Sequence, residues 1–341
     1  MNTSVKTQIS VVIPVFNGGQ VLSACLEAVQ KSTFTDYELV VVDDGSSDDT
    51  ARIAKSLADR VVTHPRNRGT AYARATGVEA ARSGLIVFVD ADVLLNPQDL
   101  GRLVAFFDAH PDVDAATGLL AESHPNPDFL SQYKNLYMHF TFRDLPKTVA
   151  FLYGSAFAIR KETFLPPGAS SETVYAEDQA LAEELMLRGK RIGFLKDWQV
   201  VHLKKYTPVS ILINDFNIPY HWAKLFVSLR GWGFGTLGRG GTGFAHAPAV
   251  RLFSIVIAPL ALTSLALIPV WPGAGKFALA FYVSWLALNL RFFIFLSKQR
   301  GIGFYVLSVP FTFLDHLVMA AGVACGLAAG LKERLLLWRK K

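Results

Sequence analysis

Short apolar runs rich in β-branched residues alternate with helical stretches through the first quarter of this 341-residue chain. The runs that predict buried strands are residues 9–15, 37–42, 60–63 and 85–89. Between them, apolar residues recur at three- and four-residue spacing, which predicts helices over residues 21–29, 50–57 and 72–81. Such alternation is typical of an α/β fold with a doubly wound, mostly parallel sheet.

Polar clusters follow three of these predicted strands directly. Asn17 begins the first cluster, Asp43 and Asp44 form the second, and Asp90 and Asp92 form the third. Ligands of parallel α/β sheets bind outside the carboxyl ends of the strands. We therefore expect the three clusters to converge on one crevice.

The Asp90-Ala91-Asp92 turn is a candidate metal and sugar-nucleotide site. Two carboxylates separated by one small residue can share a divalent ion and also reach a ribose hydroxyl. Mg²⁺ or Mn²⁺ prefers oxygen ligands and is usually completed by substrate phosphates. The alternative is an ordinary solvated turn.

The Asp43-Asp44-Gly45-Ser46 turn is the second acidic strand end. One of its carboxylates can accept hydrogen bonds from a nucleobase N–H or a ribose hydroxyl. The alternative is local, with Ser47 or Asp48 capping the helix that begins at Thr50.

The middle of the chain carries weaker signals. They predict a helix over residues 100–109, strands over 115–119 and 151–159, and a helix over 179–187. A long segment rich in Tyr, Phe and His lies among them, and no element is assigned to it.

The C-terminal part is much more apolar. Hydrophobic residues make up 51% of the chain and charged residues 18%, against about a quarter in a typical soluble domain. Residues 252–271 and 277–297 predict two membrane spans, and residues 301–331 a third, broken by Pro310, Asp315 and His316. Three spans would place the basic tail outside, so the third stretch is either a span or a re-entrant hairpin. We expect a catalytic domain at residues 1–205, an interfacial helix and linker at 206–250, and two to three spans at 251–341.

The net charge is +6, and much of the excess flanks the apolar stretches, which favours a membrane surface over nucleic acid. Only two cysteines occur, Cys25 and Cys325, so a disulfide is not expected and a reducing compartment is favoured. The first apolar run is too short for a signal peptide, which predicts a catalytic domain facing the cytoplasm.

Several short motifs occur in a specific order, and over about the first 200 residues they resemble family-2 glycosyltransferases of the GT-A fold. The motifs are Ile13-Pro14-Val15-Phe16-Asn17, Val42-Asp43-Asp44-Gly45-Ser46-Ser47-Asp48, Asn67-Arg68-Gly69 and Asp90-Ala91-Asp92. The resemblance implies a nucleotide site formed by Pro14, Val15, Phe16, Asn17, Asp43, Asp44, Gly69 and Asp90. Phe16 could stack on the base, or it could be a core aromatic. The resemblance also implies that Asp92 and Asp90 handle the metal and diphosphate, with Mg²⁺ or Mn²⁺ as the ion.

Glu177-Asp178 looks like the acidic pair of the same family, with Asp178 as general base and Glu177 orienting it or the acceptor. A sugar hydroxyl is a poor nucleophile and must lose its proton as it attacks. The alternative is two acids that complement a helix N-terminus. By resemblance, Gly154 and Ser155 line the donor-sugar pocket, and His202 is a candidate metal ligand or a structural hydrogen-bonder.

One departure from the wider superfamily is informative. Processive polysaccharide synthases carry Gln-Xaa-Xaa-Arg-Trp on the interfacial helix, whereas this chain has Ile218-Pro219-Tyr220-His221-Trp222. Only Trp222 matches, so it is a candidate acceptor-pocket residue, and polymer synthesis is not expected.

The sequence thus predicts an inverting glycosyltransferase that moves one sugar from a nucleotide-sugar donor to a hydroxyl of a lipid or lipid-linked saccharide. The alternatives are a polyprenyl-phosphate glycosyltransferase, whose acceptor needs no base, and a non-catalytic sugar-nucleotide-binding membrane scaffold.

Overall fold

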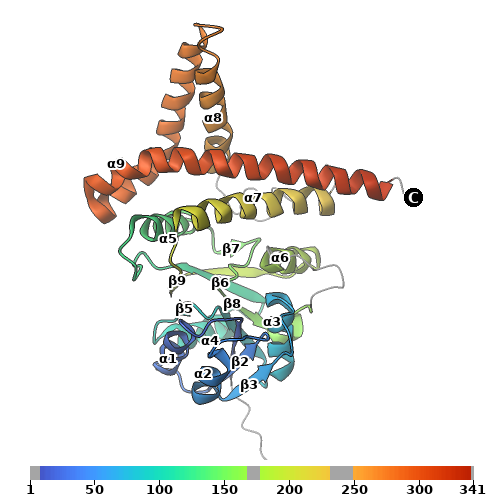
Figure 1. The fold of residues 1–341 in the computed structure, drawn as a ribbon. Helices are drawn as coiled ribbons and strands as arrows, with labels where there is room; N and C mark the ends of the chain where they lie inside the picture. The colour runs from blue at the N-terminus through green and yellow to red at the C-terminus, as the bar shows by residue number, and fades with distance from the viewer. Residues whose placement is uncertain (1–7, 167–176, 231–248, 339–341) are drawn as a thin grey trace, which may run out of the picture. The chain divides into compact units, whose positions relative to one another are not determined.

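The structure is a computed structural model that describes residues 8–166, 177–230 and 249–338 (Figure 1). The chain divides into two compact units. The α/β unit comprises Met1–Asn126 and Leu145–Lys204, and the helical unit comprises Pro127–Asp144 and Lys205–Lys341.

The first half of the α/β unit is a parallel sheet. Its strands are β1 (Ile9–Val15), β2 (Tyr37–Asp43), β3 (Arg60–Thr63) and β4 (Leu85–Val89). They lie in the order β3-β2-β1-β4, with every neighbouring pair parallel. The predicted strands are confirmed, and their carboxyl ends lie at one edge.

The second half of the sheet is mixed and continues β8-β6-β9-β5, with β7 also paired to β9. The strands are β5 (Val93–Leu94), β6 (Ala115–Leu120), β7 (Thr148–Val149), β8 (Ala156–Arg160) and β9 (Ile192–His202). Strand β8 runs antiparallel to both β4 and β6, whereas β6 and β9 are parallel.

The predicted strand over residues 151–159 begins later than expected, at Ala156. The amides before it bond to side chains instead of to a neighbouring strand. Tyr153 donates to the Thr117 hydroxyl at 2.9 Å, and Gly154 donates to the Asp178 carboxylate at 2.8 Å.

The helices of the α/β unit are α1 (Leu22–Gln30), α2 (Thr50–Leu57), α3 (Thr70–Ala80), α4 (Asp99–Ala109) and α6 (Glu177–Leu187), with a 3₁₀ turn at Lys161–Thr163. Helix α3 lies very close to the sheet. A Cβ on Gly77 would lie 2.2 Å from a methyl of Val12 on β1, so only glycine permits this approach.

The helical unit contains α5 (Phe129–Phe142), α7 (Pro208–Arg230), α8 (Ala249–Ala266) and α9 (Ala274–Trp338). Helix α5 is the aromatic segment to which the sequence assigned no element. Its N-cap is Asp128, which accepts from the Ser131 amide at 3.0 Å. Buried side chains surround much of this helix, including polar ones such as Lys134 and Asn135, so the usual apolar stripe is absent from its sequence.

The second and third predicted apolar stretches both lie in α9, which consists of two helices that meet at a kink at Gly301. Only Gly301 departs from helical geometry, with φ at +82°. Helix α9 is long and apolar enough to cross a bilayer, and α8 is a shorter apolar helix. Residues 302–338 are helical throughout, so the re-entrant hairpin is not present.

Helix α8 and the first part of α9 lie side by side, and the later part of α9 runs along α7 (Figure 1). Three glycines spaced four residues apart make the second contact close. Cβ atoms on Gly322 and Gly326 would lie 2.3 and 2.1 Å from the carbonyl oxygens of Phe216 and Tyr220 on α7. Small residues at this spacing allow helix backbones to approach.

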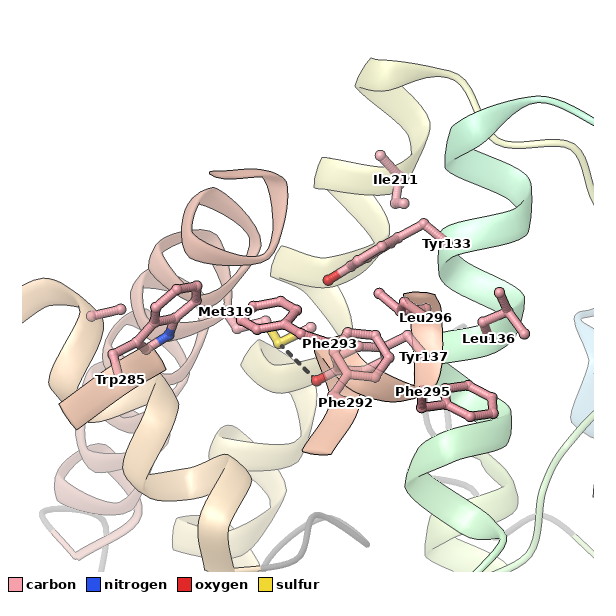
Figure 2. Close-up of a cluster of buried hydrophobic side chains, with 11 residues drawn as sticks. Tyr133, Leu136, Tyr137, Ile211, Trp285, Phe292, Phe293, Phe295, Leu296 and Met319 are labelled. Carbon is pink, nitrogen blue, oxygen red and sulfur yellow. Dashed lines mark hydrogen bonds between the residues drawn. The ribbon is translucent and has the colours of Figure 1, made fainter. Parts of the chain in front are cut away.

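An aromatic core joins α5, α8 and α9 (Figure 2). Tyr133, Tyr137 and Phe292 pack ring against ring at centroid distances of 5.6–6.0 Å. The Tyr137 hydroxyl points to Met319 Sδ at 3.8 Å.

Candidate active site

The loops that follow β1 and β2 are joined by hydrogen bonds. The Asn17 amide donates to the Ser46 hydroxyl at 2.8 Å, and the Ser47 amide donates to the Asn17 side chain at 2.9 Å. Asn17 adopts a left-handed conformation, with φ at +51°, which asparagine tolerates. Asp48 accepts from the Gly19 amide and also from the Thr50 amide at the start of α2. The N-cap of α2 is Asp49, whose side chain makes no capping bond, so neither Ser47 nor Asp48 is the N-cap.

Asp44 is buried and faces donors of its own chain. Its carboxylate accepts from the amides of Arg68 and Gly69, at 3.0 and 2.8 Å, and lies 2.6 Å from His64 Nδ1. The motif that contains Gly69 is thereby fixed at the N-terminus of α3. In Asp43, one oxygen accepts from the Ser46 amide, while the other is buried without a partner among the described residues.

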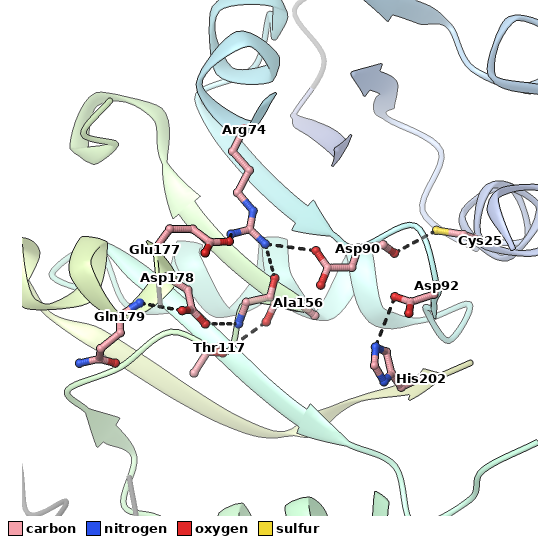
Figure 3. Close-up of polar contacts among 11 residues, drawn as sticks. Cys25, Arg74, Asp90, Asp92, Thr117, Ala156, Glu177, Asp178, Gln179 and His202 are labelled. Carbon is pink, nitrogen blue, oxygen red and sulfur yellow. Dashed lines mark hydrogen bonds and ion pairs between the residues drawn. The ribbon is translucent and has the colours of Figure 1, made fainter. Parts of the chain in front are cut away.

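Asp90 and Asp92 follow β4 but face different partners (Figure 3). Asp90 Oδ1 accepts a hydrogen bond from Arg74 at 3.1 Å, whereas Asp92 Oδ1 lies 3.3 Å from His202 Nε2. His202 ends β9, where it pairs with Val93 immediately after the acidic turn. The sheet register therefore brings residues 110 positions apart in sequence to one point.

Arg74 on α3 links the acidic groups of the site. Its side chain is only 5% exposed and donates to Asp90, to Glu177 at 3.1 Å and to the carbonyl of Gly154 at 2.7 Å. A buried cation of this kind offsets the repulsion between carboxylates that lie close together.

Asp178 lies in the first turn of α6 and is held by two amides. It accepts from Gly154 and from Gln179, each at 2.8 Å. Asp90 is connected to the same turn, because its amide donates to the Ser155 carbonyl at 3.0 Å. The structure thus brings together the acidic turn after β4, the Gly154-Ser155 turn and the Glu177-Asp178 pair.

Burial changes the acidity of this cluster. Burial raises the pKa of Glu177 to about 7, opposed by Arg74 and reinforced by Asp178. Burial also raises the pKa of Asp178 above its ordinary value, again opposed by Arg74. A carboxylate with a raised pKa is a stronger base while it remains ionised.

Of the three predicted metal ligands, only Asp92 and His202 face each other as a pair that could hold a divalent cation. Among the described residues, no three His, Cys, Asp or Glu side chains gather closely enough to hold an ion, so Asp90, Asp92 and His202 do not form a preassembled set. The reason is that Arg74 holds Asp90. Asp92 and His202 remain as a partly exposed pair, and burial, which would raise the pKa of Asp92, is outweighed by His202 and Lys204 so that the pKa is lowered. One carboxylate and one imidazole suit an ion that phosphates and water complete.

The remaining predicted residues are placed as follows. Phe16 is 49% exposed beyond the end of β1, so it is not a core aromatic. Pro14 and Val15 are buried within β1. Trp222 lies on α7 of the helical unit.

Arg74 is a candidate site residue that the sequence analysis did not identify. A signal was present, because Ala73, Arg74, Gly77 and Val78 form the buried face of α3. An arginine on the core-facing side of a helix requires acidic partners. Its acidic partners, Asp90 and Glu177, lie 16 and 103 residues away in sequence, so no local pattern connects them to Arg74.

The sequence of residues 10–165 matches the family described as "Glycosyl transferase family 2". The glycosyltransferase YibD of Escherichia coli (strain K12) is 36% identical over 96 residues, which cover 27% of each chain. A PGL/p-HBAD biosynthesis glycosyltransferase of Mycobacterium bovis (strain BCG / Pasteur 1173P2) is 36% identical over 115 residues, covering 32% of this chain and 45% of that protein. The chain spans less than half the length of these two relatives.

A mannosyltransferase from Pyrobaculum calidifontis, solved in complex with GDP-Man and Mn²⁺, has a similar fold. The TM-score is 0.56 at 17% sequence identity, and the match covers 96% of this chain and 88% of that one.

The mixed, mostly parallel sheet of the α/β unit has the GT-A fold. Residues 10–165 form a domain of the glycosyl transferase family 2 type.

Proposed function

We propose that this protein transfers one sugar, with inversion, from a nucleotide-sugar donor to a hydroxyl of a lipid or lipid-linked saccharide at a membrane. One observation carries the proposal: Asp178, a buried carboxylate with a raised pKa, is held next to Gly154 and linked through Arg74 to Asp90. A general base and a donor-binding carboxylate thus belong to one bonded assembly.

In this mechanism Asp178 accepts the proton of the acceptor hydroxyl as the oxygen attacks the anomeric carbon. The nucleoside diphosphate leaves from the opposite face, so a single displacement inverts the configuration. Phe16 stacks on the base, Asp43 supports the nucleotide, and Asp90 binds the ribose or diphosphate. Glu177, bonded to Arg74, orients the base or the acceptor.

Asp92 and His202 would hold a divalent cation, Mg²⁺ or Mn²⁺. Bound there, it would offset the charge of the diphosphate and stabilise the departing nucleotide. The Mn²⁺ in the complex of the Pyrobaculum mannosyltransferase supports this choice of ion class.

The lipid acceptor is supported by the helical unit, whose helix α9 is long and apolar enough to span a bilayer. Helix α7 would lie at the interface, with Trp222 near the acceptor. The name of the mycobacterial relative, which refers to PGL/p-HBAD biosynthesis, is consistent with such an acceptor. We place the α/β unit on the cytoplasmic side.

The test is nucleotide release from UDP-, GDP- and dTDP-sugars by the detergent-purified protein with Mn²⁺ or Mg²⁺ and a membrane-lipid extract. Lipid-dependent release from one donor, lost in Asp178→Asn, would support the proposal. Full activity in Asp178→Asn would reject the hydroxyl acceptor in favour of an already ionised phosphate. Nucleotide binding without turnover would indicate the non-catalytic scaffold.

A further inference from the structure

The helical unit buries a guanidinium whose terminal nitrogens find no hydrogen-bond acceptor among the described residues. Arg251, near the start of α8, is 5% exposed, and its Nη1 and Nη2 atoms have no hydrogen-bond partner among the described residues. An arginine carries five N–H donors and stays charged in proteins. Leaving such a group buried and unpaired is costly, so an occupant is expected.

Aromatic rings surround this side chain but cannot satisfy its donors. The guanidinium carbon lies 3.9 Å from the ring centre of Tyr137 on α5 and 4.9 Å from that of Phe292 on α9. Ring faces attract the charge, yet they offer no oxygen to the in-plane N–H groups. The in-plane N–H groups of the buried guanidinium therefore lack an acceptor in the described part of the chain.

The buried carboxylates nearby are not bonded to Arg251. Asp215 on α7 forms an ion pair with Lys134 on α5. Asp315 on α9 faces the Tyr133 hydroxyl at 3.5 Å through one oxygen, and its other oxygen has no partner among the described residues. Lys134 and Asp215 form the ion pair, and Asp315 acts on Arg251 only through its charge, so no described carboxylate accepts a hydrogen bond from Nη1 or Nη2 of Arg251.

The surroundings indicate which anion would fit. A planar guanidinium matches the oxygens of a phosphate, and the N-terminal turn of a helix such as α8 also favours negative charge. The outer face of α8 becomes apolar immediately beyond Arg251, with Phe253 60% and Val256 58% exposed. A ligand that places a phosphate at Arg251 and apolar chains along the exposed side of α8 would be a phospholipid.

We propose that Arg251 binds the phosphate group of a lipid, in a site formed by α5, α8 and α9. The lipid tails would lie along the exposed side of α8, and the rings of Tyr137 and Phe292 would hold the guanidinium in place. This site goes beyond the proposed sugar transfer, because it would exist whether or not the α/β unit turns over a donor.

The test measures binding without turnover, on the full chain in a non-ionic detergent. Short-chain phosphatidic acid is the probe, and the diacylglycerol with the same chains is the control that lacks only the phosphate. Binding is followed by titration calorimetry and by the shift in melting temperature. We expect wild type to bind phosphatidic acid and not diacylglycerol, and Arg251→Met to lose roughly tenfold or more in affinity, as expected when hydrogen bonds to a charged group are removed.

Arg291→Met is the matched variant, since it removes an equal charge from an exposed position on α9 and should bind like wild type. Arg251→Lys keeps the charge without the planar fork, so it should fold and bind with intermediate affinity. If Arg251→Met fails to fold, the affinity of Arg251→Lys for phosphatidic acid still tests the proposal.

Titration with inorganic phosphate distinguishes a lipid headgroup from a free anion as the ligand of Arg251. If it binds in an Arg251-dependent way while phosphatidic acid does not, the lipid proposal is overturned in favour of a free anion. Equal affinity of wild type, Arg251→Met and Arg251→Lys for phosphatidic acid also overturns it. In that case the guanidinium is satisfied internally, by Asp315 after a side-chain movement.

Discussion

The amide of Gly154 donates a hydrogen bond of 2.8 Å to Oδ2 of Asp178, and a Cβ added to Gly154 would lie 2.8 Å from that same oxygen. The proposed base is therefore fixed by a backbone group that leaves no room for a side chain. This relationship connects the turn before β8 directly to the first turn of α6.

Gly154→Ala should accordingly impair the chemical step more strongly than it impairs donor binding. The methyl group would displace the Asp178 carboxylate, and a misplacement of about 1 Å can cost on the order of 100-fold in rate. Steady-state kinetics should show a larger fall in kcat than rise in donor KM. Gly84→Ala is the control, because a Cβ there meets no atom within 4 Å, and it should keep wild-type kcat. A rise in donor KM alone would contradict the assignment.

Arg74→Met should move the acid limb of the pH–rate profile to higher pH. Asp178 acts in its ionised form, and the positive charge of Arg74 lowers the pKa of both Asp178 and Glu177. Removing that charge raises both pKa values, so activity is lost earlier as the pH falls. The profile of kcat/KM against pH measures this shift. Arg52→Met, at an exposed ion pair on α2, should leave the limb in place. An unmoved limb in Arg74→Met would mean that Arg74 only supports the fold.

Asp92→Asn and His202→Gln should each weaken Mn²⁺ binding in the presence of nucleoside diphosphate, by roughly tenfold or more. The two side chains lie 3.3 Å apart and are the proposed ligands. Electron paramagnetic resonance of free Mn²⁺ reports the affinity without any turnover. Asp197→Asn removes an exposed carboxylate from β9 and serves as the control. Unchanged Mn²⁺ affinity in both variants would place the ion elsewhere.

Phe16→Ala should raise the donor KM without lowering kcat to the same degree. Stacking of a base on an aromatic ring contributes about 1–3 kcal/mol, which corresponds to roughly 5- to 150-fold in affinity. Fluorescence titration with the nucleotide checks the same loss directly. Leu187→Ala, another exposed apolar side chain of the α/β unit, should have no effect. Were Phe16→Ala to bind nucleotide normally, the ring would not contact the base.

Gly326→Ala should destabilise the helical unit by about 1–3 kcal/mol, because its Cβ would lie 2.1 Å from the Tyr220 carbonyl oxygen. Gly303→Ala, on the same helix but facing open space, should be neutral or stabilising by up to about 1 kcal/mol. Melting temperatures in one detergent compare the two variants. Equal melting temperatures would show that α9 does not pack on α7 through these glycines.

Strands β1–β4 could be predicted from sequence because each buried parallel strand carries its own apolar signal and ends in turn residues. The acidic residues at their ends followed from the same logic. Helix α5 escaped prediction because its polar residues are buried together with its aromatic ones, and burial of Lys134 depends on Asp215 in a distant helix. The sequence around Lys134 contains no sign of that partner.

In the candidate site, too, the individual residues could be predicted from local patterns, whereas their contacts could not. Asp90, Asp92, Glu177 and Asp178 could be selected locally, as acids after a strand or at the start of a helix. Their connection through Arg74 depends on the packing of α3 against β1 and β2, which no local pattern encodes. The pairing of Asp92 with His202 likewise depends on the antiparallel register of β5 and β9.

The positive φ of Gly301 lets the two parts of helix α9 run in different directions, one through lipid and the other along α7. A straight α-helix of 65 residues would be on the order of 100 Å long, about three times the hydrocarbon thickness of a bilayer. An unkinked helix of that length could not both cross a membrane and pack along α7. One glycine with φ at +82° divides it into two arms that need not share a direction. The arm before Gly301 can match the depth of the lipid, while the arm after it keeps its glycine face on α7.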